Sequence, residues 1–429
     1  MRIIRGRVRR RLRRLWRRRW GAICLGACAA LLLVTAVIIP WGCSARAPIM
    51  RPIPVEGRII RVRLFQGTQG LPLAASVPPV YYSASNPAQT QLNMPANAAL
   101  PLHLAPDGWR LGAAHLGNGE LVIRPTRVGS LSVGGQTYRG EFRFIPLSGG
   151  RYDVVNHVDL DDYLQSVLSR ELLPNWHEET YRAQAIAART YALFERYQQR
   201  EARYWDVYPD ERSQVYGGIA AETPRSRQAV IDTAGIVLAY GPPGQERIFK
   251  AYFSSCCGGV GQSNSDAFNE PFVPPLAAKN VGNLCSIAPR FNWGPVVVGT
   301  DELTRRFRAW GESRNRAERD MARIVSIVPS HQVYNRPVRF IVTDAHGARY
   351  SLSGEELRWA ANSQGTILFS SFIESIVVDR DRVIFAGGHG HGHGVGMCQW
   401  CAEARARNGE RHEQIVLTAY PGARLVRAY

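Results

Sequence analysis

The sequence predicts an α+β fold, with a β-rich N-terminal portion and a mixed portion of strands and two to three helices around a substrate groove, preceded by one transmembrane helix. Three observations predict it. An uncharged apolar run lies near the N-terminus, segments of alternating polarity fill the next hundred residues, and two stretches with helical spacing of apolar residues follow. The length of 429 residues and the 45% hydrophobic content exclude a globally disordered chain.

The apolar run covers residues 21–40 and has the length that a single helix needs to cross a bilayer. The preceding segment 1–20 is dense in arginine, and such flanks stay in the cytoplasm. We therefore expect a signal anchor in the cytoplasmic membrane, single-pass, with everything after Trp41 outside the cytoplasm. A cleaved signal peptide and a lipoprotein signal ending at Cys43 are the alternatives, although no small-x-small site closes the run.

The formal net charge of +18 raises the question of nucleic-acid binding. Much of that charge sits in segment 1–20, directly beside the apolar run. We interpret the arginine block as a topology signal and expect no nucleic-acid partner. The partner that this part of the sequence predicts is the cytoplasmic membrane, bound through one helix.

Residues 41–57, rich in Ala, Arg and Pro near their start, predict a tether, 58–150 a β-rich portion, and 151–429 a catalytic portion. Strand-like alternation is found in segments 58–65, 120–128, 130–147 and 151–158. Helical spacing follows from Asp159 to a stop at Pro174, and again over 177–200, where many alanines allow close packing. Later strands are expected within 235–253, 323–344 and 375–387, and a last helix over 398–408.

Four motifs occur in order along the second portion. They are SRELLPNWHEETYRAQAIAARTYAL at 169–193, SQVY at 213–216, YFSS at 252–255 with Gly258 and Gly259, and HGVGMCQW at 393–400. In these motifs the chain resembles the SpoIID/LytB family of stage II sporulation protein D-like lytic transglycosylases and amidase enhancers. The resemblance covers roughly residues 151–429 and implies no particular developmental stage.

The resemblance implies lytic cleavage of peptidoglycan glycan strands, at the linkage between N-acetylmuramic acid (MurNAc) and N-acetylglucosamine (GlcNAc), during cell-wall remodelling. One carboxylic acid, Glu171, would protonate the glycosidic oxygen and help the 6-hydroxyl of the sugar to close onto C1. The residues alone also suit Glu171 to this role, because the apolar Leu172 and Leu173 follow it and could raise its pKa. A solvated carboxylate at a helix end is the alternative.

The resemblance also assigns Arg189 to the site, where its planar guanidinium could hold a carboxylate or acetamido oxygen of the substrate. A surface salt bridge to Glu195 or Glu178 is the alternative. The remaining polar residues of the motifs offer neutral hydrogen-bonding groups, which suit the hydroxyls and amides of sugars. These expected substrate-binding residues are Gln184, Gln214, Tyr216, Ser254, Ser255 and Gln399.

Three histidines, His389, His391 and His393, alternate with glycines and at first suggest a metal site. In a strand they would share one face, but six glycines favour a tight loop that approaches a ligand. Only His393 falls on the family motif, and we expect it to line the substrate site. The other two histidines are expected to be incidental, and no metal is predicted.

No cofactor is expected. Some family members have a zinc site of Cys and His just before the Gln-Val-Tyr segment, but residues 206–213 contain neither residue type. Disulfides are the expected fate of cysteines outside the membrane, with Cys256 or Cys257 joined to Cys285 and another bridge to Cys398 or Cys401. A thiolate metal site that includes Cys398-x-x-Cys401 is the alternative.

A second functional hypothesis stays open. LytB-like relatives are described as amidase enhancers, so the chain could bind glycan strands and stimulate a cell-wall amidase without cutting. Both hypotheses predict peptidoglycan as a partner, and the second adds the amidase. The intact Glu171 and Arg189 favour the enzyme.

Overall fold

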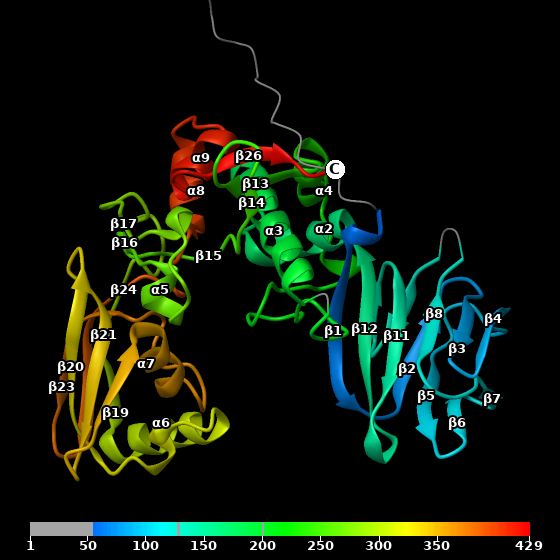
Figure 1. Ribbon diagram of the computed structural model, residues 1–429, viewed down its shortest axis with the longest axis horizontal. Coiled ribbons are helices and arrows are strands. Elements are labelled where there is room, and N and C mark those ends of the chain that lie inside the picture. Colours follow the sequence, from blue (N-terminus) through cyan, green and yellow to red (C-terminus); the bar gives the residue numbers. More distant parts are fainter. Residues whose placement is uncertain (1–54, 127–128, 200) are drawn as a thin grey trace, which may run out of the picture. The chain divides into compact units, whose positions relative to one another are not determined.

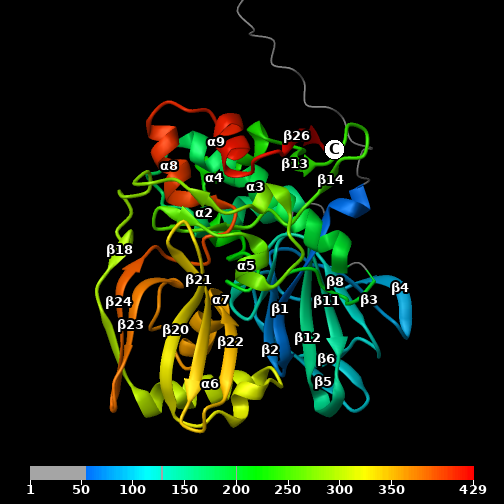
Figure 2. The same cartoon turned by 60° about the vertical axis from the view of Figure 1, so that its left-hand side comes forward.

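The structure, a computed structural model, describes residues 55–126, 129–199 and 201–429. All of them lie within one unit of the chain, Pro48–Tyr429. Figure 1 labels the helices and strands, and Figure 2 shows them turned by 60°. The predicted basic segment 1–20, the predicted anchor 21–40 and most of the predicted tether lie outside the described residues.

The predicted transmembrane helix requires a correction. Among the described residues, every helix is too short or too polar to cross a bilayer. The longest, α3 (Glu178–Gln199), has 22 residues, but it carries several glutamates and arginines. The fold class is therefore a mixed α/β architecture without a membrane-spanning helix in the described residues. The single-pass localisation and the membrane as a partner, which rested on that helix, find no support.

The N-terminal part consists of two six-stranded antiparallel sheets, ordered β1-β12-β11-β8-β3-β4 and β10-β9-β2-β5-β6-β7. Burial alternates at the start of β1, where Ile60 and Val62 face the core. The strands are β1 (Ile59–Thr68), β2 (Leu71–Ala75), β3 (Val80–Ser83), β4 (Asn86–Gln91), β5 (Leu100–Ala105), β6 (Gly108–Leu111), β7 (Ala114–His115), β8 (Leu121–Arg124), β9 (Leu131–Val133), β10 (Gln136–Tyr138), β11 (Glu141–Pro146) and β12 (Tyr152–Asp159). The predicted boundary at 150/151 thus falls between two paired strands, β11 and β12.

Aromatic side chains fill the core of this part. The fully buried Trp109 ring lies 6.0 Å from the Phe144 ring and 5.1 Å from the Tyr152 ring, both edge to face. Its indole Nε1 donates to the Gly119 carbonyl at 2.7 Å, so the one polar atom of the side chain is satisfied. These rings belong to a hydrophobic core that continues into the buried side chains of residues 160–193.

Three helices follow, α2 (Leu160–Glu171), α3 and α4 (Pro224–Asp232). Asp159 caps α2, because its carboxylate accepts the Asp161 N–H at 2.9 Å. Helix α2 ends after Glu171, where Leu172 turns to an extended conformation ahead of the predicted stop at Pro174. Small alanines along α3 allow it to contact α2, α4, α8 and α9. Both helices that the sequence predicts in this region are confirmed.

Short strands and two helices complete the part that surrounds α3. Strands β13 (Ile236–Tyr240), β14 (Arg247–Ile248) and β26 (Arg424–Arg427) form one sheet, and β16 (Val260–Gly261) pairs with β17 (Lys279–Asn280). Strand β15 (Phe253–Ser254) runs parallel to β25 (Met397–Cys398). Helices α8 (Gln399–Arg407) and α9 (His412–Ala419) follow β25 directly. The β15–β25 pair joins the third and fourth sequence motifs.

Residues 292–389 form a separate set of elements with their own core, which includes Phe307, Trp310, Phe340 and Phe385. They are β18 (Asn292–Trp293), β19 (Val296–Gly299), α6 (Thr300–Ser313), β20 (Ile324–Val333), β21 (Arg336–Asp344), β22 (Arg349–Ser353), α7 (Gly354–Ala361), β23 (Phe372–Val378) and β24 (Arg382–His389), with α5 (Asn264–Phe268) against α7. Strand β18 pairs with the end of β24, so this set begins and ends at one place. Gly388 is required there, since a Cβ would lie 2.1 Å from the Trp293 ring.

Candidate functional site

Glu171 is the last residue of α2, and two segments from distant parts of the sequence meet its carboxylate. The Val215 backbone N–H donates to Oε1 at 3.2 Å, and the Gln399 side-chain amide donates to Oε2 at 3.3 Å. Val215 is the middle residue of the Gln-Val-Tyr motif, and Gln399 opens α8. The structure therefore brings the first, second and fourth sequence motifs together at this carboxyl group.

The surroundings of Glu171 change its acidity. Burial raises the pKa of the Glu171 carboxyl above its usual value, because the low-dielectric surroundings disfavour the charge. The N–H groups of Val215 and Gln399 act in the opposite direction by stabilising the carboxylate. A raised pKa increases the protonated fraction at a given pH. The group is thus better suited to donate a proton than a solvated glutamate is.

The Gln399 amide can serve both protonation states of Glu171. An amide has an NH2 group that donates and a carbonyl oxygen that accepts. In the geometry described, Nε2 faces the carboxylate and donates to it. A half-turn of the amide would present its oxygen to a protonated Glu171 instead. Gln399 can therefore keep a hydrogen bond to Glu171 in both protonation states by rotating its side-chain amide, without a movement of its backbone.

Gln214 and Tyr216, on either side of Val215, face the protein interior. Tyr163 donates its hydroxyl proton to Gln214 Oε1 at 3.1 Å, and Gln214 Nε2 donates to the Ala188 carbonyl at 3.4 Å. The Tyr216 hydroxyl donates to Asn156 Oδ1 at 3.1 Å, and burial raises the pKa of this tyrosine. These contacts fix the backbone that presents the Val215 N–H to Glu171.

Arg189 is fully buried on α3, and protein groups surround its guanidinium. Nη2 lies 3.1 Å from Asp161 Oδ1 at the start of α2, and Nε lies 3.1 Å from the Tyr429 hydroxyl. The remaining N–H groups point to the carbonyls of Val230 and Ile236 and to the Thr233 hydroxyl. The predicted surface salt bridges to Glu195 or Glu178 are replaced by this internal network, which ties α2, α3, α4 and β13 together.

The other expected binding residues are also mostly internal. Ser254 is buried, and its Oγ accepts the Gly394 N–H at 3.1 Å. The Ser255 carbonyl accepts the Trp400 N–H at 3.1 Å. Gln184 is fully buried on α3, and its amide makes no hydrogen bond within residues 55–126, 129–199 and 201–429. The two serines therefore join the third motif to the fourth.

The three histidines do not converge. His389 contacts Asn292 through Nδ1 and Glu374 through Nε2, both at 2.7 Å. His391 packs against the Phe369 ring. His393 accepts the Val395 N–H through Nδ1 at 3.0 Å, and burial lowers its pKa to about 4, so the ring is neutral near pH 7. The backbone turns at the intervening glycines, which have positive φ.

Two residue groups within the described ranges could hold a metal ion. One is Cys257, Cys285, Cys398 and Cys401, and the other is Glu179, His412 and Glu413. In the second, His412 Nδ1 already lies 2.6 Å from Glu179 Oε2. Neither group contains His389, His391 or His393.

Sequence reasoning missed two contacts among the motif residues. One is made by the Val215 N–H, a backbone group that no residue type reveals. The other is the edge-to-face pair of Trp176 and Trp400, whose rings lie 4.7 Å apart. Trp176 lies in the first motif and Trp400 in the fourth, so their place in the motifs was the sequence signal that could have indicated this contact.

Comparison with known proteins agrees with the motifs. The family model described as Stage II sporulation protein, SpoIID, matches residues 148–240, which contain Glu171 and the Gln-Val-Tyr segment. An uncharacterized protein of Brachyspira hyodysenteriae is 26% identical over 312 residues, covering 72% of this chain and 77% of that protein. A protein of Bacillus subtilis named amidase enhancer is 25% identical over 300 residues, covering 61% of this chain but only 40% of that protein.

The segments that carry these similarities meet at Glu171. The matched segment supplies the end of α2, α3 and the backbone that contacts Glu171, and the fourth motif supplies the second contact. The resemblance of the motifs to the SpoIID/LytB family is thus confirmed by the family match over residues 148–240 and by the similarity to a protein named amidase enhancer.

Proposed function

We propose that the chain is a lytic transglycosylase, which cuts the MurNAc-GlcNAc linkage of peptidoglycan glycan strands with Glu171 as its single acid and base. The family supports a role connected with the cell wall. The observation that carries the finer proposal is the Glu171 carboxyl. Its pKa is raised by burial, and it is held by N–H donors from two distant motifs.

In the proposed reaction, protonated Glu171 gives its proton to the glycosidic oxygen, and the bond from that oxygen to C1 of MurNAc breaks. The 6-hydroxyl oxygen of the same sugar then bonds to C1, and its proton passes to the Glu171 carboxylate. The acid is regenerated, no water is consumed, and the product carries a 1,6-anhydro ring. The N–H groups of Val215 and Gln399 would stabilise the carboxylate between the two proton transfers.

Three aspartates near Glu171 in sequence are too far from it in space to be a second acid, whereas Glu211 lies near enough for its charge to raise the Glu171 pKa. Asp159, Asp161 and Asp162 lie at the start of α2, whereas Glu171 ends it. At 1.5 Å per residue, the helix separates them by about 14–18 Å along its axis. Hydrolytic glycosidases place their two carboxyl groups roughly 5–9.5 Å apart. These aspartates are therefore too distant to act as the second acid.

We infer that the strand binds in a surface depression next to the acid in sequence, which Glu171 itself does not line. It is lined by Ser169 and Arg170 of α2, and by Tyr181, Pro224 and Arg225 among others. The arginines supply positive charge, and stripping the peptide from MurNAc exposes a lactyl carboxylate. We expect strands without peptides to bind there in preference.

The direct test is mass spectrometry of products after incubation of the purified full chain with peptide-stripped glycan strands. We expect fragments that end in 1,6-anhydro-MurNAc, lighter by one water than the products of hydrolysis. Reducing ends without the anhydro ring would contradict the lytic reaction.

The second candidate function is glycan binding that stimulates a separate amidase. The name of the Bacillus subtilis relative, amidase enhancer, favours it, although the similarity spans only 40% of that protein. Intact strands that nevertheless co-sediment with the chain would support this function. Faster release of stem peptides by an added cell-wall amidase would then identify the partner.

The pH dependence of cleavage should follow Glu171. Because the protonated form is the active one, the rate is expected to fall as the pH rises through the Glu171 pKa. Removing the Gln399 N–H in Gln399→Leu removes a contact that lowers this pKa. The alkaline limb of the pH-rate profile should therefore move to higher pH.

The matched control for this shift is Gln228→Leu, on the exposed side of α4, where the amide contacts Asp232 at 2.7 Å. Its profile should coincide with that of the unmodified chain. An alkaline limb that stays in place in Gln399→Leu would show that another group controls the rate.

A further inference from the structure

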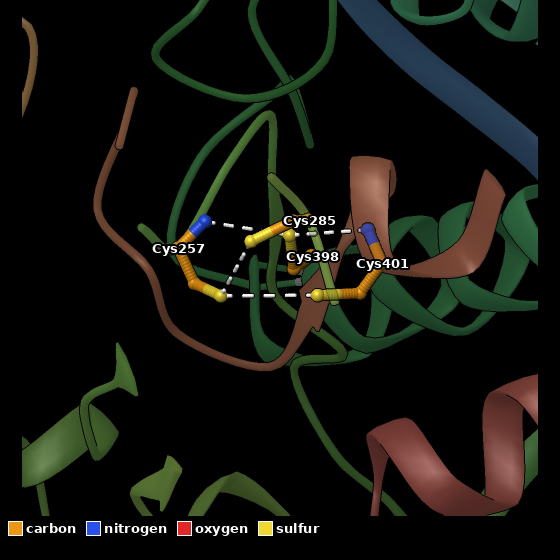
Figure 3. A group of neighbouring side chains, drawn as sticks. All are labelled: Cys257, Cys285, Cys398 and Cys401. Atoms are coloured by element: carbon orange, nitrogen blue, oxygen red, sulfur yellow. Dashed lines mark hydrogen bonds between the residues drawn. The ribbon is translucent and has the colours of Figure 1, made fainter. Parts of the chain in front are cut away.

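Four buried cysteines lie together near the start of α8. They are Cys257, Cys285, Cys398 and Cys401, and their Sγ atoms all lie within 4.8 Å of one another. Figure 3 shows their side chains gathered around one point, on three separate segments of the chain. Cys256 is also buried, but it does not belong to this group among the described residues.

The spacing of the sulfur atoms fits tetrahedral thiolate coordination. Cys257 Sγ lies 3.6 Å from Cys285 Sγ and 3.9 Å from Cys401 Sγ. A tetrahedron with zinc-sulfur bonds of about 2.3 Å has edges of about 3.8 Å. A disulfide requires about 2.05 Å between the sulfurs. The measured distances therefore match a shared metal better than a bridge between any of these pairs.

The local backbone favours thiolates. Cys398 caps the N-terminus of α8, and the N–H groups of Cys257 and Cys401 point to its Sγ at 3.3 and 3.4 Å. N–H donors and the positive end of a helix both stabilise a negative sulfur. Cys401 lies three residues further on the same helix, which gives the Cys-x-x-Cys spacing of many structural zinc sites.

Two basic side chains lie next to the four cysteines. Lys279 and Arg405 line a cavity of about 450 Å³ together with Cys257, Cys398 and Cys401. Four thiolates around a divalent ion have a net charge of −2, and these two basic side chains would offset it.

We propose that Cys257, Cys285, Cys398 and Cys401 bind one structural zinc ion. All four positions of the ion would be filled by protein sulfur, so it would have no place for water or substrate. The proposal is independent of the proposed function, because it rests on the cysteine geometry alone. Its structural consequence is that the ion joins the segment after β15, the 281–288 turn and the start of α8.

This ion would also hold Gln399 in place. Gln399 lies between the ligands Cys398 and Cys401, and its amide contacts Glu171. Loss of the metal should therefore loosen both the α8 start and the second donor to the acid.

The test is the metal content of the purified full chain, measured by plasma mass spectrometry after preparation under reducing conditions without chelators. We expect about one zinc per chain, and X-ray absorption should give about four sulfur neighbours at about 2.3 Å. Cys285→Ser should reduce the content to less than about 0.1 per chain. Cys256→Ser is the matched control and should retain the metal.

Because Cys285→Ser could fail to fold, the unmodified chain also provides a test. A mercurial thiol reagent should release the zinc as it modifies the four ligand cysteines among the eight of the full chain, and a coloured chelator records the release. Three results would overturn the proposal. They are a chain without zinc, disulfide-linked peptides containing any two of the four cysteines, and zinc neighbours that are mainly nitrogen or oxygen.

Discussion

Glu171→Gln is expected to lower the rate of glycan-strand cleavage by roughly 10²- to 10⁴-fold, the usual contribution of a general acid. Glutamine cannot give a proton to the glycosidic oxygen, and it has almost the same volume as glutamate. The measurement is the initial rate of anhydro-product formation by chromatography with mass detection. Strand binding, measured by co-sedimentation, should persist because no binding contact is removed.

The fold of this variant should be retained. In the parent chain, burial raises the Glu171 pKa, so above that pKa the charged group opposes folding, and glutamine removes this cost. Against it, the amide has one acceptor oxygen for two N–H donors, from Val215 and Gln399. Glu178→Gln, on an exposed residue of α3, is the control and should cut normally. Undiminished cleavage by Glu171→Gln would exclude the proposed acid.

Arg189→Met should destabilise the fold by about 3 kcal/mol, the low end of the range for breaking a buried ion pair, because the Asp161 partner is partly exposed. Here the Asp161 carboxylate loses its partner, and the carbonyls of Val230 and Ile236 lose their donors. The free energy of unfolding, from urea titration followed by tryptophan fluorescence, measures the loss. The result distinguishes an internal structural role of Arg189 from the substrate-binding role that the sequence predicted.

Arg212→Met is the control for this measurement. Arg212 forms an exposed ion pair with Asp210, and such pairs contribute about 0–1 kcal/mol. A direct role of Arg189 in substrate binding would give a different pattern, in which stability is unchanged and the Michaelis constant rises. That pattern would contradict the internal role that its contacts indicate.

The sequence predicted the local elements that depend on periodicity. The spacing of Leu160, Tyr163, Leu164, Val167 and Leu168 gave α2, and these side chains are buried as expected. Strands β2 to β7 were not anticipated one by one, because segment 71–115 is rich in Pro, Ala and Asn and alternates poorly. There, pairing within the sheets outweighs weak strand propensity.

Long-range contacts at the site were predicted only through the resemblance. Nothing local connects Gln399 with Glu171, which precedes it by 228 residues. The histidines show the opposite case, where the local glycine pattern already favoured a loop over a strand with three histidines on one face. Positive φ angles of 78°, 92° and 69° at Gly390, Gly392 and Gly394 turn the chain, so alternation in sequence does not become alternation on a strand.

The cysteines lie between these cases. Cys398 and Cys401 are recognisable as one helix turn, but their meeting with Cys257 and Cys285 depends on the parallel pairing of β15 with β25. Sequence reasoning could therefore name the disulfide and metal alternatives without choosing between them.

The contact between Glu171 and Gln399 has a consequence for biosynthesis. At 5–20 residues per second, the ribosome needs roughly 10 to 45 s to add the 228 residues that separate them. During that interval the N-terminal sheets and α2 can fold, but the acid lacks its second donor and β15 lacks its parallel partner. We expect a nascent chain to acquire a complete site only after Gln399 and the rest of α8 have been made. If the proposed function is correct, a growing polypeptide is unable to cut before that point.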